Sequence, residues 1–244
     1  MSEKHKKIKI RYLKLSCLAE ISDNYTIELD CIDLFYVDLT GFLNSQNLFL
    51  SYLSSDELMR VNNLRGENNK EYALCSFGVR REIISRYLQV RPEIISYVFN
   101  PNGKPVLKNK NQLKLSFNIS HSHSRMLLGI VSSCDIGVDI QYIDSSLPFK
   151  KIAERFFKKD ESEYFASLPI NEAVIMFYNF WTVKEAYIKA TGEGFSLPFY
   201  DVQVPTLPFE EYEEIMVSGK VWYRFSFLTN EEYAASLIVS PLKR

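Results

Sequence analysis

Hydrophobic and polar residues follow two repeating patterns along this chain, one with the period of a strand and one with the period of a helix. Alternation predicts strands at residues 8–18, 25–39 (one or two strands), 94–99, 113–119, 126–131, 136–143, 202–204, 214–217, 221–227 and 233–239. Helical spacing predicts helices from Ser54 or Ser55, over 70–88, from Pro148, over 160–168, and in the stretch that ends at Gly194. Strands, a long helix and more strands therefore occur in each half. We predict an α+β fold of two similar, pseudo-twofold-related α/β lobes, residues 1–133 and 134–244, with a ligand cleft between them.

The most strongly patterned helix contains the segment FYNFWTVKEAYIKATGEG, residues 177–194. Glycine readily adopts a left-handed backbone, so Gly192 and Gly194 are expected to end this helix. Glu185 and Lys189 are four residues apart and lie side by side on one face. By themselves they are typical of an exposed ion pair worth roughly a few tenths of a kcal/mol. A catalytic role for them requires a second acidic element elsewhere in the chain. The apolar residues at helical spacing predict a separate, buried face: Ala173, Phe177, Phe180, Trp181 and Ile188.

Composition is that of an ordinary folded protein with no global charge. The 244 residues are 46% hydrophobic and 24% charged, and the formal net charge is −1, which gives no electrostatic reason to expect a nucleic acid partner. No apolar run approaches the length of a membrane span, and the N-terminus lacks the apolar core of a signal peptide, so we expect no membrane association and a cytoplasmic location. Four widely spaced cysteines form no CxxC pair and are interpreted as reduced core thiols: Cys17, Cys31, Cys75 and Cys134.

Polar residues at three places are candidates for a ligand site. In the strand predicted at 136–143, Asp139 and Gln141 lie on the polar side, which is either a solvent face or the wall of a cleft. The sequence NPNGKP predicts a turn that places Lys104 at a hairpin tip or a strand start. The pair His121-x-His123 could belong to a transition-metal site, but it lacks cysteine or acidic partners at ligand spacing.

The order and spacing of several motifs resemble the 4′-phosphopantetheinyl transferase superfamily, in particular its long two-lobed members of the type that activates surfactin synthetase. These motifs are NGKP (102–105), FNISHS (117–122), GVDIQ (137–141), RFF (155–157) and WTVKEAYIKATGEGFSLP (181–198). The similarity covers about residues 50–205. It implies an enzyme that transfers the phosphopantetheine arm of coenzyme A to a serine of an acyl or peptidyl carrier protein and releases 3′,5′-ADP.

By this resemblance, Asp139 and Glu185 are metal-binding acids for Mg²⁺, with Mn²⁺ as an alternative ion, and the metal neutralises the pyrophosphate. Glu185 is also the candidate base for the carrier serine, directly or through a water. Lys189 matches the lysine that neutralises or protonates the leaving phosphate. Gln141 stands where many relatives carry a second acid, and its amide oxygen can ligate a metal without supplying charge.

The resemblance also implies contacts to coenzyme A. His121 matches a contact to the 3′-phosphate, Ser120 can donate a further hydrogen bond, and Lys104 matches a basic residue that meets the ligand's phosphates. The family places further basic residues ahead of its first long helix, where the register in this chain is blurred. The candidates there are Arg60, Arg65, Lys70 and Arg81, of which we favour Arg65 and Arg81.

A carrier protein is the expected macromolecular partner, because basic residues of the second lobe can meet its acidic recognition helix. These residues are Lys150, Lys151, Arg155, Lys158 and Lys159. Two lobes in one chain can build the site that smaller relatives build between subunits, so we expect a monomer. Two alternatives stay open: a non-catalytic coenzyme A or carrier-protein binding module of the same fold, and a structural α+β protein in which Glu185 and Lys189 are surface residues. The extension at residues 1–30 has no assigned role.

Overall fold

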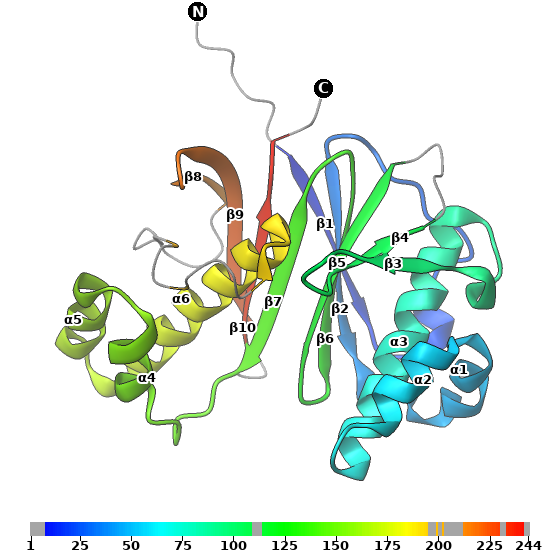
Figure 1. Ribbon diagram of the computed structural model, residues 1–244, viewed down its shortest axis with the longest axis horizontal. Coiled ribbons are helices and arrows are strands. Elements are labelled where there is room, and N and C mark those ends of the chain that lie inside the picture. Colours follow the sequence, from blue (N-terminus) through cyan, green and yellow to red (C-terminus); the bar gives the residue numbers. More distant parts are fainter. Residues whose placement is uncertain are drawn as a thin grey trace, which may run out of the picture.

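The computed structural model describes residues 8–108, 114–194, 199, 202, 212–229 and 233–241. Two four-stranded sheets lie against each other in the middle of the molecule, and helices cover the outer face of each sheet (Figure 1). The strand orders are β1-β2-β6-β5 in the first sheet and β7-β10-β9-β8 in the second. This layered arrangement confirms the predicted mixture of helices and sheets in two similar halves.

The first half of the chain builds the first sheet and the helices beside it. Its strands are β1 (Lys9–Leu15), β2 (Cys31–Asp38), β5 (Leu115–Ser122) and β6 (Arg125–Ser132), with β1 parallel to β2 and the other pairs antiparallel. A small hairpin of β3 (Tyr97–Phe99) and β4 (Pro105–Leu107) stands apart from this sheet. The helices are α1 (Gln46–Tyr52), α2 (Ser55–Asn62) and α3 (Glu67–Leu88), with 3-10 turns at Leu18–Glu20, Leu39–Ser45 and Pro92–Ile94.

The second half repeats this plan with a fully antiparallel sheet. Its strands are β7 (Ile136–Tyr142), β8 (Tyr212–Val217), β9 (Lys220–Leu228) and β10 (Tyr233–Val239). The helices α4 (Phe149–Phe156), α5 (Lys159–Ser167) and α6 (Ile170–Thr191) lie on its outer side (Figure 1). The long helices α3 and α6 therefore form the two outer layers, with both sheets between them.

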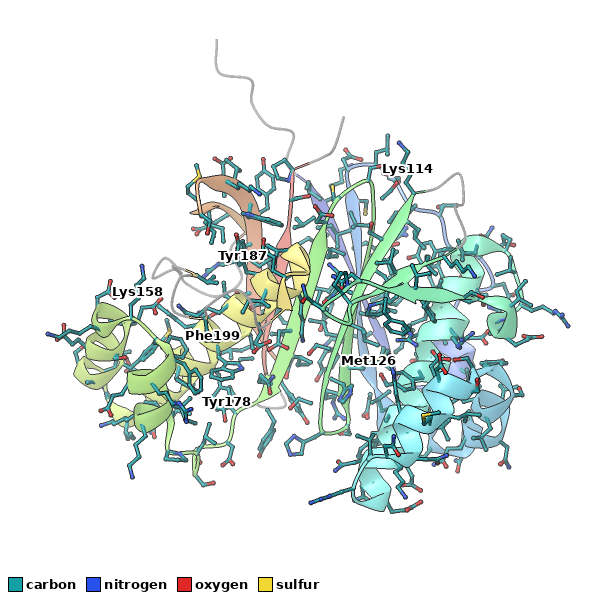
Figure 2. The ribbon with its side chains drawn as sticks, in the orientation of Figure 1. Lys114, Met126, Lys158, Tyr178, Tyr187 and Phe199 are labelled. Carbon is teal, nitrogen blue, oxygen red and sulfur yellow. The ribbon has the colours of Figure 1, made fainter. Side chains whose placement is uncertain are left out.

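Side-chain alternation along the strands divides the core into three clusters. One face of each sheet meets the other sheet, through residues such as Leu34, Val138 and Leu237. The opposite faces bury Phe35 against the α3 side and Ile238 against the α6 side. Most central strands are thus buried on both faces, which explains why their sequences contain few polar residues. The labelled Met126 in Figure 2 lies between β6 and α3, where its sulfur accepts a hydrogen bond from Ser76 Oγ at 3.3 Å.

Helix α6 and strand β7 are in backbone contact, and this contact depends on a glycine. A Cβ atom added at Gly137 would lie 1.9 Å from the carbonyl oxygen of Ala186. The helix ends as predicted at Gly192, which has a φ of +72° and donates its N–H to Ile188 O at 3.0 Å. The two elements that carry the predicted acids are consequently fixed side by side.

Most predicted elements are confirmed, and the differences have local causes. Ser54 caps α2 as expected: its Oγ accepts from the Glu57 N–H, and its own N–H donates to the Glu57 carboxylate. Residues 25–39 contain only β2, and the sequence did not reveal α1, which has no strong apolar stripe. Phe49 of α1 is buried against Gly78 of α3, so a tertiary contact stabilises this short helix. Of the strand predicted at 202–204, residues 203 and 204 lie outside the described part of the chain.

The cysteine prediction holds for three of the four residues. Cys31, Cys75 and Cys134 are buried thiols that form no disulfide with another described residue, whereas Cys17 also forms none but is only half-buried. Among the helices described, none is both long enough and apolar enough to cross a bilayer.

Candidate active site

A cleft of about 430 Å³ contains side chains from both lobes and collects most of the predicted site residues. The first lobe contributes Ser76 and Phe77 of α3 and Ile119, Ser120 and His121 of β5. The second lobe contributes Asp139 and Gln141 of β7 and Trp181, Glu185 and Lys189 of α6. The packing of the two lobes thus brings six of the predicted site residues together in one cleft: Ser120, His121, Asp139, Gln141, Glu185 and Lys189.

Asp139 is the centre of the hydrogen-bond network in this cleft. Its side chain is only 1% exposed, so the polar side of β7 is a cleft wall and not a solvent face. Oδ1 accepts hydrogen bonds from Ser120 Oγ and from Lys189 Nζ, each at 2.7 Å. Oδ2 accepts a longer hydrogen bond from Gln141 Nε2 at 3.3 Å. A carboxylate held from three sides is fixed in one orientation.

Lys189 bridges the two lobes instead of pairing within its helix. Its Nζ lies 2.7 Å from Asp139 Oδ1 and 2.9 Å from Ser120 Oγ, so it contacts β7 and β5 together. Glu185 and Lys189 are both described, and no ion pair joins them. The arrangement therefore differs from the exposed intrahelical pair that was the simplest interpretation of their spacing.

Glu185 is half-buried near Asp139, and its surroundings disfavour the ionised carboxylate. The pKa of Glu185 is raised, first because burial removes water from the carboxyl group and second because the Asp139 charge repels its own. Lys189 opposes this effect and lowers the pKa of Glu185. Oxygen donors that repel one another in this way favour a bound cation, because the cation would offset their charge.

His121 lies at the mouth of the cleft, where solvent reaches its ring. The pKa of His121 is lowered, first because the surrounding walls displace water and second because of the positive charge of Lys189. His123 lies with its ring against Tyr142, with 5.0 Å between ring centroids. Within the described ranges, no group of three or more histidine, cysteine, aspartate or glutamate side chains could hold a metal ion. The histidine pair therefore gains no support as a transition-metal site.

Three predicted ligand contacts lie outside this cleft. The Arg81 side chain is buried, and its guanidinium donates to Glu57 Oε2 at 2.9 Å and to the carbonyl oxygens of Pro92 and Ile95. These contacts give Arg81 a structural role in place of the predicted phosphate contact, because its donors already have partners inside the first lobe. Arg65 is exposed in the segment before α3 and does not line the cleft.

Lys104 is the third of these residues, and it contacts backbone carbonyls. Its Nζ donates to Ile136 O and to Ala190 O, each at 3.1 Å. The turn that carries Lys104 forms as predicted, with Gly103 at a φ of +83°. The ammonium group therefore lies between the start of β7 and the end of α6, outside the cleft that Asp139 and Lys189 share.

The sequence motifs did not identify Lys184, which is fully buried beside the site. Its Nζ donates to Glu161 Oε2 at 2.9 Å and to the carbonyl oxygens of Val202 at 2.5 Å and Phe199 at 3.4 Å. Burial lowers the pKa of Lys184, and the hydrogen bond that Lys184 donates to Glu161 opposes that shift. Phe199, which is labelled in Figure 2, in turn lies against Trp181, with ring centroids 4.8 Å apart. Trp181 also lines the cleft, so it is a cleft wall as well as a core residue. Lys184 could have been recognised in the sequence because it falls on the apolar stripe of α6, where a charged residue is unusual.

Several known proteins similar to this chain are named as 4′-phosphopantetheinyl transferases. The family model described as "4′-phosphopantetheinyl transferase superfamily" matches residues 135–238, and a model for a 4′-phosphopantetheinyl transferase N-terminal region matches residues 43–133. The 4′-phosphopantetheinyl transferase HetI of Nostoc sp. is 28% identical over 218 residues, which is 89% of this chain and 91% of HetI.

Two further relatives match about two thirds of the chain. A Synechocystis sp. protein named as a 4′-phosphopantetheinyl transferase is 31% identical over 70% of this chain and 69% of its own length. The 4′-phosphopantetheinyl transferase Sfp of Bacillus subtilis is 29% identical over 67% of this chain and 70% of its own length. The matched regions include both lobes.

Proposed function

Because the chain belongs to the 4′-phosphopantetheinyl transferase superfamily, we propose that it transfers the 4′-phosphopantetheine arm of coenzyme A to a serine of an acyl or peptidyl carrier protein. The observation that carries this proposal is the convergence of Asp139, Glu185 and Lys189 with Ser120 and His121 in one cleft. Acids, a lysine and phosphate-binding groups from different elements are the set that phosphoryl transfer requires.

In the proposed reaction, the carrier serine oxygen forms a bond to the phosphorus that carries the pantetheine arm. The bond from that phosphorus to the bridging oxygen of the pyrophosphate breaks, and 3′,5′-ADP leaves. Glu185 accepts the serine proton, directly or through a water. Lys189 neutralises or protonates the oxygen of the leaving phosphate.

Residues of the first lobe hold the nucleotide end in this proposal. His121 donates to the 3′-phosphate from the mouth of the cleft, and the Ser120 hydroxyl lies within the same wall. The positive charge for the pyrophosphate comes from Lys189 in the second lobe, 2.9 Å from Ser120. Substrate binding therefore requires both lobes, whereas the proposed base belongs to the second lobe alone.

The oxygen donors of the cleft fit a hard divalent cation, which we propose to be Mg²⁺. Asp139 and Glu185 would hold it. Burial and, second, repulsion from the Asp139 charge raise the pKa of Glu185, and a bound cation would offset this repulsion. Two carboxylates are sufficient for Mg²⁺, which keeps several waters and accepts substrate phosphates as ligands. When bound, the ion supplies charge neutralisation at the pyrophosphate. Gln141 donates to Asp139 Oδ2, so it orients that carboxylate whether or not its own oxygen is a ligand.

The carrier protein is proposed to bind over α4 and α5. Lys150, Lys151 and Arg155 are exposed there, and Phe156 is 36% exposed beside them. Basic side chains around an exposed aromatic ring fit an acidic helix with an apolar contact at its centre.

Intact mass spectrometry of apo carrier proteins tests the transfer. A small panel of acyl and peptidyl carriers is incubated with the protein, coenzyme A and Mg²⁺, in parallel with EDTA and with an Asp139→Asn variant. The expected result is a mass gain of one phosphopantetheine group that EDTA and Asp139→Asn each abolish. Coenzyme A binding without a mass gain on any carrier would refute the enzyme and favour the non-catalytic binding module, since Gln141 supplies no charge to a metal.

A further inference from the structure

The turn between β3 and β4 closes over the C-terminal end of α6. Asn100 Nδ2 and Asn102 Nδ2 each donate to Gly192 O at 2.9 Å. Lys104 Nζ donates to Ala190 O and to Ile136 O at 3.1 Å. We call these three side chains the clasp. All three belong to the first lobe, and every acceptor belongs to the second.

The conformation of the turn presents the clasp side chains together. Asn100 Oδ1 accepts from the N–H groups of Asn102 and Lys104, at 3.0 and 2.8 Å, so one side chain organises the whole turn. The second lobe leaves room for it with glycines. A Cβ atom at Gly192 would lie 2.9 Å from Asn100 Nδ2, and one at Gly194 would lie 3.0 Å from Asn102 Cβ.

The acceptors of the clasp adjoin the charged groups of the active site. The last carbonyls of a helix lack intrahelical partners and form the negative end of its dipole, so an ammonium group is favourable there. Ala190 directly follows Lys189, and Ile136 is three residues before Asp139 on β7. One ammonium group therefore links the backbone beside Lys189 to the backbone of the strand that holds Asp139.

We propose that the clasp positions Lys189 and Asp139 for catalysis, and that Lys104 is a positioning residue instead of a phosphate contact. This inference rests on the proposed transferase function. The direct distance between Lys189 Nζ and Asp139 Oδ1 is 2.7 Å, and the clasp fixes the two backbones on which that distance depends. Small displacements of catalytic groups reduce turnover strongly, so loss of the clasp lowers kcat more than it weakens substrate binding.

Hydrogen–deuterium exchange of the protein without substrate tests the clasp independently of activity. Lys104→Met keeps the aliphatic stem and removes the donors, Lys104→Arg retains donors, and Lys108→Met is the matched control, because Lys108 is exposed on the same hairpin. We expect amide exchange at residues 186–192 to rise about tenfold in Lys104→Met and to recover in Lys104→Arg. Asn102→Ala, a milder change at an exposed position, is expected to raise exchange at residue 192 and its neighbours to a smaller extent. Unchanged exchange in both Lys104→Met and Asn102→Ala would overturn the proposal.

Steady-state kinetics with coenzyme A and 3′-dephospho-coenzyme A provides the second arm. For Lys104→Met we expect kcat to fall about ten- to a hundredfold while KM for coenzyme A stays within about twofold. The preference for coenzyme A over its dephospho form should not change. A KM that rises about tenfold at constant kcat, with loss of that preference, would instead make Lys104 a phosphate contact. If the unmodified protein transfers nothing to any carrier, the proposed function fails, and the exchange experiment still decides whether the clasp exists.

Discussion

Helices α3 and α6 have the same length and the same arrangement of charges, but they use those charges differently. Each contains 22 residues, and in each the fifteenth residue is basic, the sixteenth is glutamate and the twentieth is basic. In α3 these residues are Arg81, Glu82 and Arg86, and in α6 they are Lys184, Glu185 and Lys189. The two lobes therefore share a local sequence pattern in addition to their order of elements.

The fifteenth residue of each helix forms the same kind of ion pair, with a glutamate of a neighbouring short helix. Arg81 binds Glu57 of α2 at 2.7 Å, and Lys184 binds Glu161 of α5 at 2.9 Å. Both glutamates also accept the N–H of the N-cap residue of their own short helix, which is Ser54 for α2 and Lys158 for α5. This basic residue thus attaches a short helix to a long one in each lobe, and has no part in the cleft.

The sixteenth and twentieth residues of the two helices make different contacts. Glu82 is 4% exposed and binds Arg86 of the same helix, so this pair stays within α3, and Arg86 also lies 3.8 Å from Asp23. Lys189 instead contacts Asp139 and leaves Glu185 open to the cleft. The difference arises from β7, which places an acid within reach of the lysine. In α6, a neighbouring strand competes for the basic member of the pair that α3 keeps within the helix.

The largest expected effect comes from removing the two equivalent glutamate charges. Glu185→Gln should lower kcat about 10²- to 10⁴-fold, because the proposed base is lost. Glu82→Gln should leave kcat within about threefold and cost about 1–3 kcal/mol of unfolding free energy, because it weakens a buried bond to Arg86. Transfer assays and urea unfolding of both variants provide the measurement. Equal loss of activity in the two variants would contradict the proposal that Glu185 acts in transfer and Glu82 does not.

A second comparison concerns the two lysines of α6. Lys184→Met leaves Glu161 buried without its partner and should reduce the free energy of unfolding by about 3–5 kcal/mol. Lys189→Met leaves the buried Asp139 carboxylate with Ser120 and Gln141 as its remaining partners, so it should reduce the free energy of unfolding by a smaller amount, about 1–3 kcal/mol, and it should abolish transfer. Thermal and denaturant unfolding distinguish them, and a Lys184→Met/Glu161→Met double variant should recover much of the lost stability. A Lys184→Met variant as stable as the parent would show that the Lys184–Glu161 pair does not stabilise the fold.

Sequence motifs predicted the members of the cleft better than they predicted the partners of each charge. Asp139, Glu185 and Lys189 lie together in the cleft, as the resemblance of their motifs to the family implies. The same resemblance implies a phosphate contact for Arg81, but the Arg81 guanidinium is bonded to Glu57. Its partner Glu57 lies 24 residues earlier, and that pairing exists only after α2 has packed on α3.

The fold shows the same division between local signals and contacts of residues far apart in the sequence. Strand alternation and the glycine stop of α6 are local signals, and both gave correct elements. Lys184 shows the opposite case, because a lysine on an apolar stripe becomes intelligible only when Glu161 and the carbonyls of Phe199 and Val202 are brought to it. Local patterns therefore specified the elements, whereas the contacts between elements decided which charges remained available for chemistry.

A smaller effect is expected for His121, the first-lobe residue at the cleft mouth. Its pKa is lowered in the free protein, so the ring is neutral near pH 7, and a bound phosphate should raise that pKa again. Coenzyme A affinity should then increase as pH falls from the pKa in the complex toward the lower pKa of the free protein, with uptake of up to about one proton. Calorimetry in two buffers of different ionisation enthalpy measures this uptake. His121→Gln should lose most of it and raise KM for coenzyme A about tenfold. Proton uptake that persists unchanged in that variant would assign the titration to the ligand or to another group.

The smallest effect is expected at the surface proposed for the carrier protein, and it contrasts the basic residues of the two lobes. Lys150→Glu and Lys151→Glu on α4 should each weaken an acidic carrier by about two- to fivefold, mainly through slower association, and should reduce its salt dependence. Lys70→Glu, near the start of α3, is the matched charge reversal in the first lobe and should have no such effect. Surface plasmon resonance at two salt concentrations separates these cases. Equal losses from both lobes would indicate a response to net charge, because a docking surface confined to the second lobe cannot respond to a change on α3.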